Sequence, residues 1–371
     1  MQGTGPGSDG GASSTFDAGP LWDGAVTNAS CKPAGSVWEN ASPPASNYAN
    51  TTTGITSVVV RPDNPAVVIV GADSKGIFRS TDCGATWALA STGRNADLMA
   101  SGRPWSMALD PRAPDVMYTV EGYGAGGLFK TTNGGMDWDQ VLPDDILNAF
   151  SYKGQIDSVN IDPSDHTHLL VESHGSNGAT GVCATQTCLA ESKDEGATWT
   201  LISIPTAWGE NSGVVMLSRT TWLYCSLFGG LFRTTDEGMS WKPVSMPSGA
   251  QTSCNVYNPY LYQDSSGSYY MPSLQGGVLK SAPQDSSTWS FIPNSPKGTT
   301  LLPTSTNLVV SNQFQLGYSI APQSNAGSWT NLPTPVGPSS DHGGIYLAYD
   351  SLHHILYSAN FAGGLWQIGA D

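Results

Sequence analysis

The chain has 371 residues, of which 39% are hydrophobic and only 12% are charged. Thirty acidic residues against 15 lysines and arginines give a formal net charge of −15, which argues against a nucleic-acid partner because such a partner needs a basic face. No apolar run approaches the roughly 18 residues that a membrane span requires. Glycine (43) and proline (25) are abundant, and no stretch keeps the apolar period of a helix, so we expect an all-β protein.

The chain opens with a Gly/Ser-rich stretch that is typical of a flexible tether. We expect residues 1–30 to form this tether between a signal or lipid anchor and a single folded domain over residues 31–371. No signal peptide is recognisable, which indicates a mature form.

Six cysteines and no C-x-x-C pair favour disulfides over a zinc site, and therefore an oxidising, extracellular or periplasmic location. Cys183 and Cys188 flank a four-residue loop and are expected to bond to each other. The other four are expected to pair as well, and their spacing leaves the partners open. Cys225 with Cys254 is the favoured pair.

One motif recurs along the chain, with the pattern Ser/Thr-x-Asp-x-Gly-x-Thr-Trp. In such a turn the Asp carboxylate accepts backbone N–H groups, the Gly supplies a positive φ, and the Trp packs between neighbouring sheets. An aromatic or aliphatic strand precedes most copies, so the turn joins two strands of one small antiparallel sheet. Four good copies lie at 80–87, 131–138, 192–199 and 234–241, and two degraded copies lie at 281–289 and 323–329.

Upstream of the turns runs a second repeated segment, a strand, a turn that is usually Asp-Pro, and another strand. Together the two segments give four strands per unit, which is one blade of a β-propeller. Seven units account for the chain, although six or eight remain open. The last unit lacks an outer strand, and residues 35–41 with Trp38 are expected to supply it and close the ring. The predicted blades span 54–91, 103–143, 154–205, 210–247, 252–293, 298–333 and 342–369.

The repeated motif resembles the Asp-box (BNR-like) turn of carbohydrate-active propellers, including sialidases, xyloglucan hydrolases, sortilin-like receptors and polysaccharide lyases. The Arg-Ile-Pro segment of sialidases is missing, and xyloglucan hydrolases of this type have two propellers, whereas this chain can make one. Five segments look similar to single-propeller rhamnose–glucuronate lyases: 92–97, 102–105, 168–174, 188–191 and 358–366. This resemblance implies a secreted lyase that cleaves an acidic polysaccharide or oligosaccharide at a uronic acid.

Residues just before the first strand of a blade, or just after its second, are expected at one mouth of the central channel. A uronate lyase needs a group that neutralises the carboxylate, a base for the C5 proton and an acid for the leaving oxygen. Arg103 or Arg94, or a calcium ion, fits the first role, His174 or His342 the second, and Tyr123 the third. No cofactor is otherwise required. The remaining candidates, expected to bind substrate, are Arg94, Trp105, Asp157, Glu210, Asn211, Gln275 and Gln313.

Two other functions stay open. A glycoside hydrolase would use two carboxylates roughly 5–10 Å apart, and a non-catalytic glycan or protein binder would need only aromatic and polar side chains at the mouth. We expect a monomer in each case. The hydrolase candidates are Asp157, Glu210, Glu121 and Asp341. The histidines that are expected to lie at the surface without a functional role are His166, His168, His353 and His354.

Overall fold

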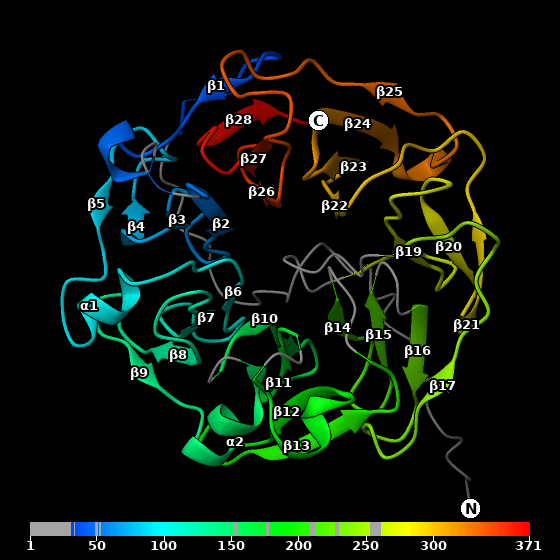
Figure 1. Cartoon of the computed structure of the whole chain (residues 1–371). Helices are drawn as coiled ribbons and strands as arrows, with labels where there is room; N and C mark the ends of the chain where they lie inside the picture. The colour runs from blue at the N-terminus through cyan, green and yellow to red at the C-terminus, as the bar shows by residue number, and fades with distance from the viewer. Residues whose placement is uncertain are drawn as a thin grey trace, which may run out of the picture.

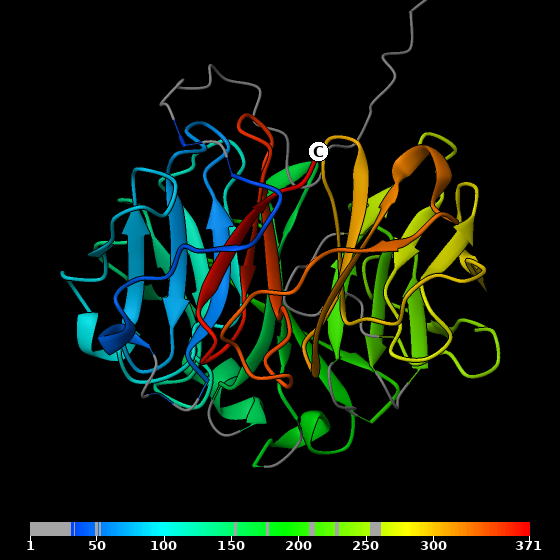
Figure 2. The ribbon, with the colours of Figure 1, turned by 90° about the horizontal axis from the view of Figure 1, so that it is seen from above.

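The computed structural model forms seven four-stranded antiparallel sheets arranged around a central axis (Figure 1). The prediction of an all-β, seven-bladed propeller is therefore confirmed. Seen from the side, the strands run between the two faces of the ring (Figure 2). The structure describes residues 31–371 except 33, 49–50, 52, 152–153, 176–177, 208–211, 227–229 and 253–260, and the tether expected at residues 1–30 lies outside the described part.

Each blade is built from strands that follow one another in the chain, apart from the last. Blades one to three contain β2 (Ile55–Val60), β3 (Val68–Ala72), β4 (Gly76–Ser80), β5 (Ala88–Leu89); β6 (Met107–Leu109), β7 (Met117–Val120), β8 (Leu128–Thr131), β9 (Asp139–Gln140); and β10 (Ile156–Asp162), β11 (Asp165–Ser173), β12 (Thr187–Ser192), β13 (Thr200–Ile204). Blades four to six contain β14 (Gly213–Met216), β15 (Trp222–Ser226), β16 (Gly230–Thr234), β17 (Lys242–Pro243); β18 (Tyr262–Gln263), β19 (Tyr269–Met271), β20 (Leu279–Ala282), β21 (Asp285–Phe291); and β22 (Thr300–Pro303), β23 (Asn307–Asn312), β24 (Gln315–Pro322), β25 (Thr330–Asn331). Blade seven contains β26 (Tyr346–Asp350), β27 (Ile355–Ala359), β28 (Leu365–Gly369) and β1 (Glu39–Asn40), and the helical turns are α1 (Ala96–Met99), α2 (Asp144–Ala149), η1 (Ala45–Asn47), η3 (Gly181–Ala184) and η4 (Gln323–Asn325).

The ring is closed by the N-terminal segment, as predicted. Glu39 pairs with Gln367 and Asn40 with Trp366, so β1 becomes the outer strand of blade seven. Trp38 is buried in the core cluster of that blade and its ring lies 4.5 Å from the ring of Tyr318 in blade six. The two ends of the chain thus share one sheet, which leaves no open edge at the junction.

The repeated turns have the local geometry that their sequence predicts. In the first, the Asp82 carboxylate accepts the backbone N–H of Thr86 at 2.8 Å, and Gly84 has a φ of +86°. The indole N–H of Trp87 donates to the carbonyl of Ala41, which follows the closing strand of the neighbouring blade. Trp199 repeats this contact with Val141 of blade two. Trp87 and Trp199 each tie their blade to the one before it.

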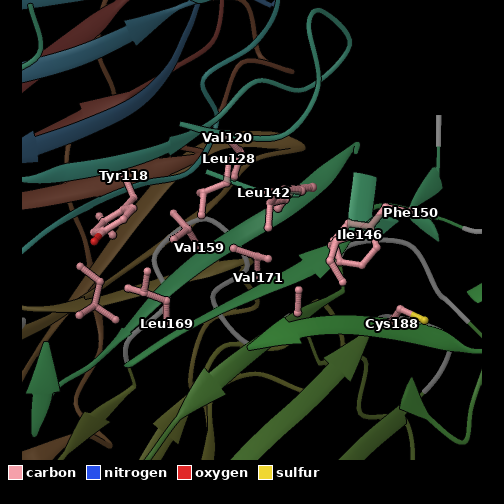
Figure 3. Packing of buried hydrophobic residues seen from close by; sticks show 14 of the residues in the cluster. Tyr118, Val120, Leu128, Leu142, Ile146, Phe150, Val159, Leu169, Val171 and Cys188 are labelled. Atoms are coloured by element: carbon pink, nitrogen blue, oxygen red, sulfur yellow. The ribbon is translucent and has the colours of Figure 1, made fainter. Parts of the chain in front are cut away.

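Between the blades the core is apolar and shut off from water. Figure 3 shows the cluster between blades two and three, in which Tyr118 and Val120 face Val159 and Leu169. Ile146 of α2 and the adjacent Phe150 cover one end of this cluster. Burial of these side chains is the main force that holds neighbouring sheets together.

Two disulfides join described residues. Cys183–Cys188 closes the short loop as predicted, and Cys31–Cys83 ties the N-terminal segment to the first repeated turn of blade one. Cys254, the expected partner of Cys225, lies outside the described residues. In the part of the chain that the structure covers, no helix is long and apolar enough to cross a membrane.

His168 corrects the expectation of a surface histidine. Its side chain is buried on β11, with Nδ1 bonded to Asp162 at 3.1 Å and Nε2 to Glu191 at 2.9 Å. Burial opposes the charged imidazolium, but the two carboxylates outweigh it and raise the pKa of His168. His166 and His353 also pair with acidic residues of the strand turns, Asp110 and Asp350, so these histidines have structural roles.

Replacing Trp38 by alanine tests the ring closure. The variant leaves a large cavity between blades six and seven, so we expect the free energy of unfolding to fall by about 3–5 kcal/mol. Urea denaturation measures this loss. Val37→Ala is the matched control, because Val37 is 60% exposed and its truncation should change stability by less than about 0.5 kcal/mol. Equal stability of the two variants would show that Trp38 at the β1–β28 junction does not contribute to the free energy of unfolding.

Candidate functional site

One mouth of the channel receives two loops from every blade. In an antiparallel blade, the chain entering the innermost strand and the chain leaving the second strand lie at the same end. In blade two, Arg103 precedes β6 and forms a β-bridge with Gly122, which follows β7. In blade three, Gln155 precedes β10, and its backbone carbonyl accepts the backbone N–H of His174, which follows β11. The candidate site lies where these loops of blades two and three meet.

A chain of three polar side chains connects the two blades there. The Tyr123 hydroxyl lies 3.0 Å from Nε2 of His174, and Nδ1 of His174 lies 2.6 Å from Oδ1 of Asp157. The other oxygen of Asp157 accepts the hydroxyl of Ser212 at 3.1 Å. A neutral imidazole that donates from Nδ1 to a carboxylate accepts at Nε2, so this arrangement can pass a proton between His174 and Tyr123.

Tyr123 is held in a conformation that most residues avoid. Its φ is +57°, and its side chain is 54% exposed although it stands beside a buried site. The side-chain oxygen of Gln155 accepts its backbone N–H at 2.7 Å. Gly102 and Gly124 let the two loops of blade two touch, since a Cβ on Gly124 would lie 2.5 Å from the Cα of Gly102. Strain of this kind is concentrated at functional sites.

Arg103 adds a positive charge beside the tyrosine. Its guanidinium carbon lies 4.6 Å from the centre of the Tyr123 ring, and its Nε is 3.6 Å from Asp73 of blade one. Trp105 stands edge-on to Tyr123 with ring centres 5.2 Å apart, and its indole N–H donates to the carbonyl of Ile156. Trp105 is almost fully buried, so it supports the site from below rather than offering an open stacking surface.

Two glutamates lie behind these groups and are shut off from solvent. Burial, reinforced by the nearby charge of Asp73, raises the pKa of Glu121 well above its ordinary value. Burial and the charge of Asp157 raise the pKa of Glu172 in the same way, partly offset by Ser212. Burial therefore disfavours the ionised form of both glutamates.

Five of the predicted site residues meet here: Arg103, Trp105, Tyr123, Asp157 and His174. The others are placed elsewhere or lie outside the described part. Arg94 is a correction, because it forms an exposed ion pair with Asp139 on the outer strand β9, 2.6 Å from Nε to Oδ1. Gln275 follows β19 in blade five and accepts a hydrogen bond from Lys297, and Gln313 is buried after β23 in blade six. His342 precedes β26 in blade seven and bonds to Ser339. Glu210 and Asn211 lie outside the described residues.

Several residues of the site were not predicted from the sequence. Gln155 occupies a position just before an inner strand, so the strand-end rule that selected Arg103 could have found it. Glu172 is an acidic residue within an otherwise apolar buried strand, which is also a readable signal. Asp73 and Ser212 are small polar residues in loops, and nothing in their local sequence distinguishes them.

The described residues offer a single cluster with enough potential metal ligands, formed by Cys31, Cys83 and His353. The two cysteines of this cluster are bonded to each other, so their sulfurs are not thiolate ligands. A calcium ion at the channel mouth stays a prediction.

The fold is shared with several solved structures. A GH74 xyloglucanase from Xanthomonas campestris is 17% identical over 89% of this chain and 53% of its own, with a TM-score of 0.59, so this chain spans about half the length of that enzyme. YCF48 bound to D1 peptide is 15% identical over 94% of this chain and all of its own, with a TM-score of 0.61. An extracellular domain attributed to a hybrid two-component system of B. thetaiotaomicron is 12% identical over 87% of this chain and 40% of its own, with a TM-score of 0.60. No protein-family model and no curated protein matches the chain.

These similarities establish a propeller fold that is used both by glycoside hydrolases and by proteins of other kinds. At such low identity the fold carries no activity with it. The function must be argued from the residues at the mouth.

The backbone strain at Tyr123 can be measured with a matched pair of variants. Tyr123→Gly and Tyr123→Ala lose the same side-chain contacts beyond Cβ, but glycine adopts a φ of +57° without penalty. We expect the glycine variant to be more stable by about 1 kcal/mol in chemical denaturation. An alanine variant as stable as the glycine variant would show that the loop relaxes and that Tyr123 is not strained.

Proposed function

We propose that this protein is an extracellular carbohydrate-active enzyme, a monomeric lyase that cleaves an acidic glycan at a uronic acid by β-elimination. The observation that carries the proposal is the 3.0 Å contact between Tyr123 and His174 beside the guanidinium of Arg103. A base, an acid and a cation are the three groups that such an elimination needs. The disulfides agree with an oxidising location.

The proposed proton transfers return His174 and Tyr123 to their starting protonation states. Nε2 of His174 takes the C5 proton of the uronate, and the imidazolium that forms is stabilised by Asp157 at 2.6 Å. Tyr123 turns its hydroxyl from Nε2 to the O4 leaving oxygen and gives it a proton, while the C4–O4 bond breaks and the C4–C5 double bond forms. His174 then returns its proton to the tyrosinate, which restores both groups for the next turnover.

Arg103 is the group proposed to meet the substrate carboxylate. Neutralising the carboxylate acidifies the C5 proton, and guanidinium binds planar carboxylates well. Nε of Arg103 pairs with Asp73, and the guanidinium lies over the ring of Tyr123. The proposed base, acid and cation thus lie close enough together to act on one sugar. His342 remains a second candidate for the base.

A glycoside hydrolase is the alternative, and the fold of the GH74 enzymes is compatible with it. Such an enzyme needs two carboxyl groups that both reach the sugar. Of the predicted candidates, Asp157 is engaged by His174 and Ser212, Glu121 is completely buried, Asp341 lies exposed beside Ser339, and Glu210 is outside the described residues. This arrangement favours proton transfer through His174 over a carboxylate pair.

The chemistry is tested by incubating the protein with glucuronate-containing polysaccharides, such as those with rhamnosyl-glucuronate ends. A lyase product absorbs in the ultraviolet because it contains the C4–C5 double bond. New reducing ends without this absorbance would contradict the lyase proposal and support a glycoside hydrolase. Binding without either product would indicate a non-catalytic glycan binder.

Single substitutions test the assigned roles. His174→Ala should lower kcat by roughly 10²–10⁴-fold because the base is lost, and Arg103→Ala should raise KM and also lower kcat. Arg94→Ala is the matched control, since Arg94 lies on the outer strand and its loss should leave both constants unchanged. Near-normal activity in both His174→Ala and His342→Ala would overturn a histidine base.

A further inference from the structure

Behind His174 lies a pair of buried acidic side chains. Asp157 is bonded to His174, and Glu172, two residues before His174 on β11, is completely buried next to Asp157. Ser212 lies between them, donating to Oδ2 of Asp157 and interacting with Glu172. Two adjacent buried carboxyl groups cannot both be ionised without a large cost.

Which of the two carboxyl groups holds a proton decides which nitrogen of His174 carries hydrogen. If Asp157 is ionised, it accepts from Nδ1, and Nε2 is left to accept from Tyr123. If Asp157 held the proton, it would donate to Nδ1, and Nε2–H would point at the tyrosine oxygen. Only the first arrangement gives His174 a basic nitrogen toward the substrate.

The surroundings favour Glu172 as the site of the proton. Both of its carboxyl oxygens are buried, and neither accepts a hydrogen bond of good geometry from a described residue. Asp157, by contrast, is bonded to His174 on one oxygen and to Ser212 on the other. An ionised carboxylate is stabilised by such bonds and is costly where they are missing. Among the described residues Asp157 is the charged group that faces Glu172.

We propose that Glu172 is a positioning residue that keeps a proton at neutral pH and, through Ser212, holds Asp157 ionised and His174 in the tautomer with hydrogen on Nδ1. The hydrogen bonds then all run in one direction. Glu172 donates to the Ser212 oxygen, Ser212 donates to Asp157, Asp157 accepts from Nδ1 of His174, and Nε2 accepts from Tyr123. The catalytic consequence rests on the proposed function, whereas the proton positions do not.

Two spectroscopic measurements on the whole protein test the proposal without substrate. Infrared difference spectra of wild type against Glu172→Gln at neutral pH should show the loss of one protonated carboxylic acid band. Nitrogen-15 NMR of the histidine rings should show His174 protonated on Nδ1 in wild type and in Glu172→Gln, because the amide also donates. Ser212→Ala removes the link and should produce a mixture of both tautomers, whereas Ser358→Ala, a buried serine of blade seven, should not.

Absence of the acid band difference, or an unchanged His174 tautomer in Ser212→Ala, would overturn the proposal. Where the uronate lyase reaction is found, Ser212→Ala should lower kcat about tenfold with KM unchanged. A strong loss of activity in Glu172→Gln would mean that Glu172 acts ionised, which also contradicts it. If no lyase activity exists, the proposed function fails, but the two spectra still decide the proton positions.

Discussion

The pairing of β1 with β28 is the constraint on which the molecule depends. Seven sheets can bring their inner ends to one mouth only when the ring is closed, and closure here rests on the short β1 pairing and on Trp38. The repeated turns add further contacts between blades, because Trp87 and Trp199 each bond to the preceding blade. The geometry of the mouth is therefore set in part by contacts on the outer rim.

At the mouth, the acidic side chains differ in burial and in the partners that they contact. Asp73 and Asp157 keep charged or polar partners, whereas Glu121 and Glu172 are closed off from water, which raises the pKa of both glutamates. Blades two and three thus share a buried glutamate that lies near an aspartate, although that aspartate comes from blade one for Glu121 and from blade three itself for Glu172. The repeat is consistent with the four-strand unit, since both glutamates stand at the end of the second strand of their blade.

The sequence predicted those features that depend on local patterns. Turn motifs gave the blade boundaries, Trp38 gave the closing strand, and the short loop gave Cys183–Cys188. The strand-end rule also found Arg103, Tyr123 and His174. It failed for Arg94, because the loop that carries this residue folds back on β9 instead of toward the axis. His168 was misjudged because the strand β11 begins earlier than the turn pattern suggested, at Asp165. Contacts that cross between blades, such as Ser212 with Asp157, leave no mark in either local sequence.

The strongly acidic chain and the proposed acidic substrate are compatible because the two charges act over different distances. A net charge of −15 is spread over the whole surface, and salt screens it beyond about 8 Å at physiological ionic strength. Inside the mouth the relevant charges are local, and burial raises the pKa of Glu121 and Glu172, which disfavours additional negative charge there. One arginine can then attract a carboxylate in a protein that repels anions elsewhere. Substrate specificity would accordingly depend on burial at the site more than on overall composition.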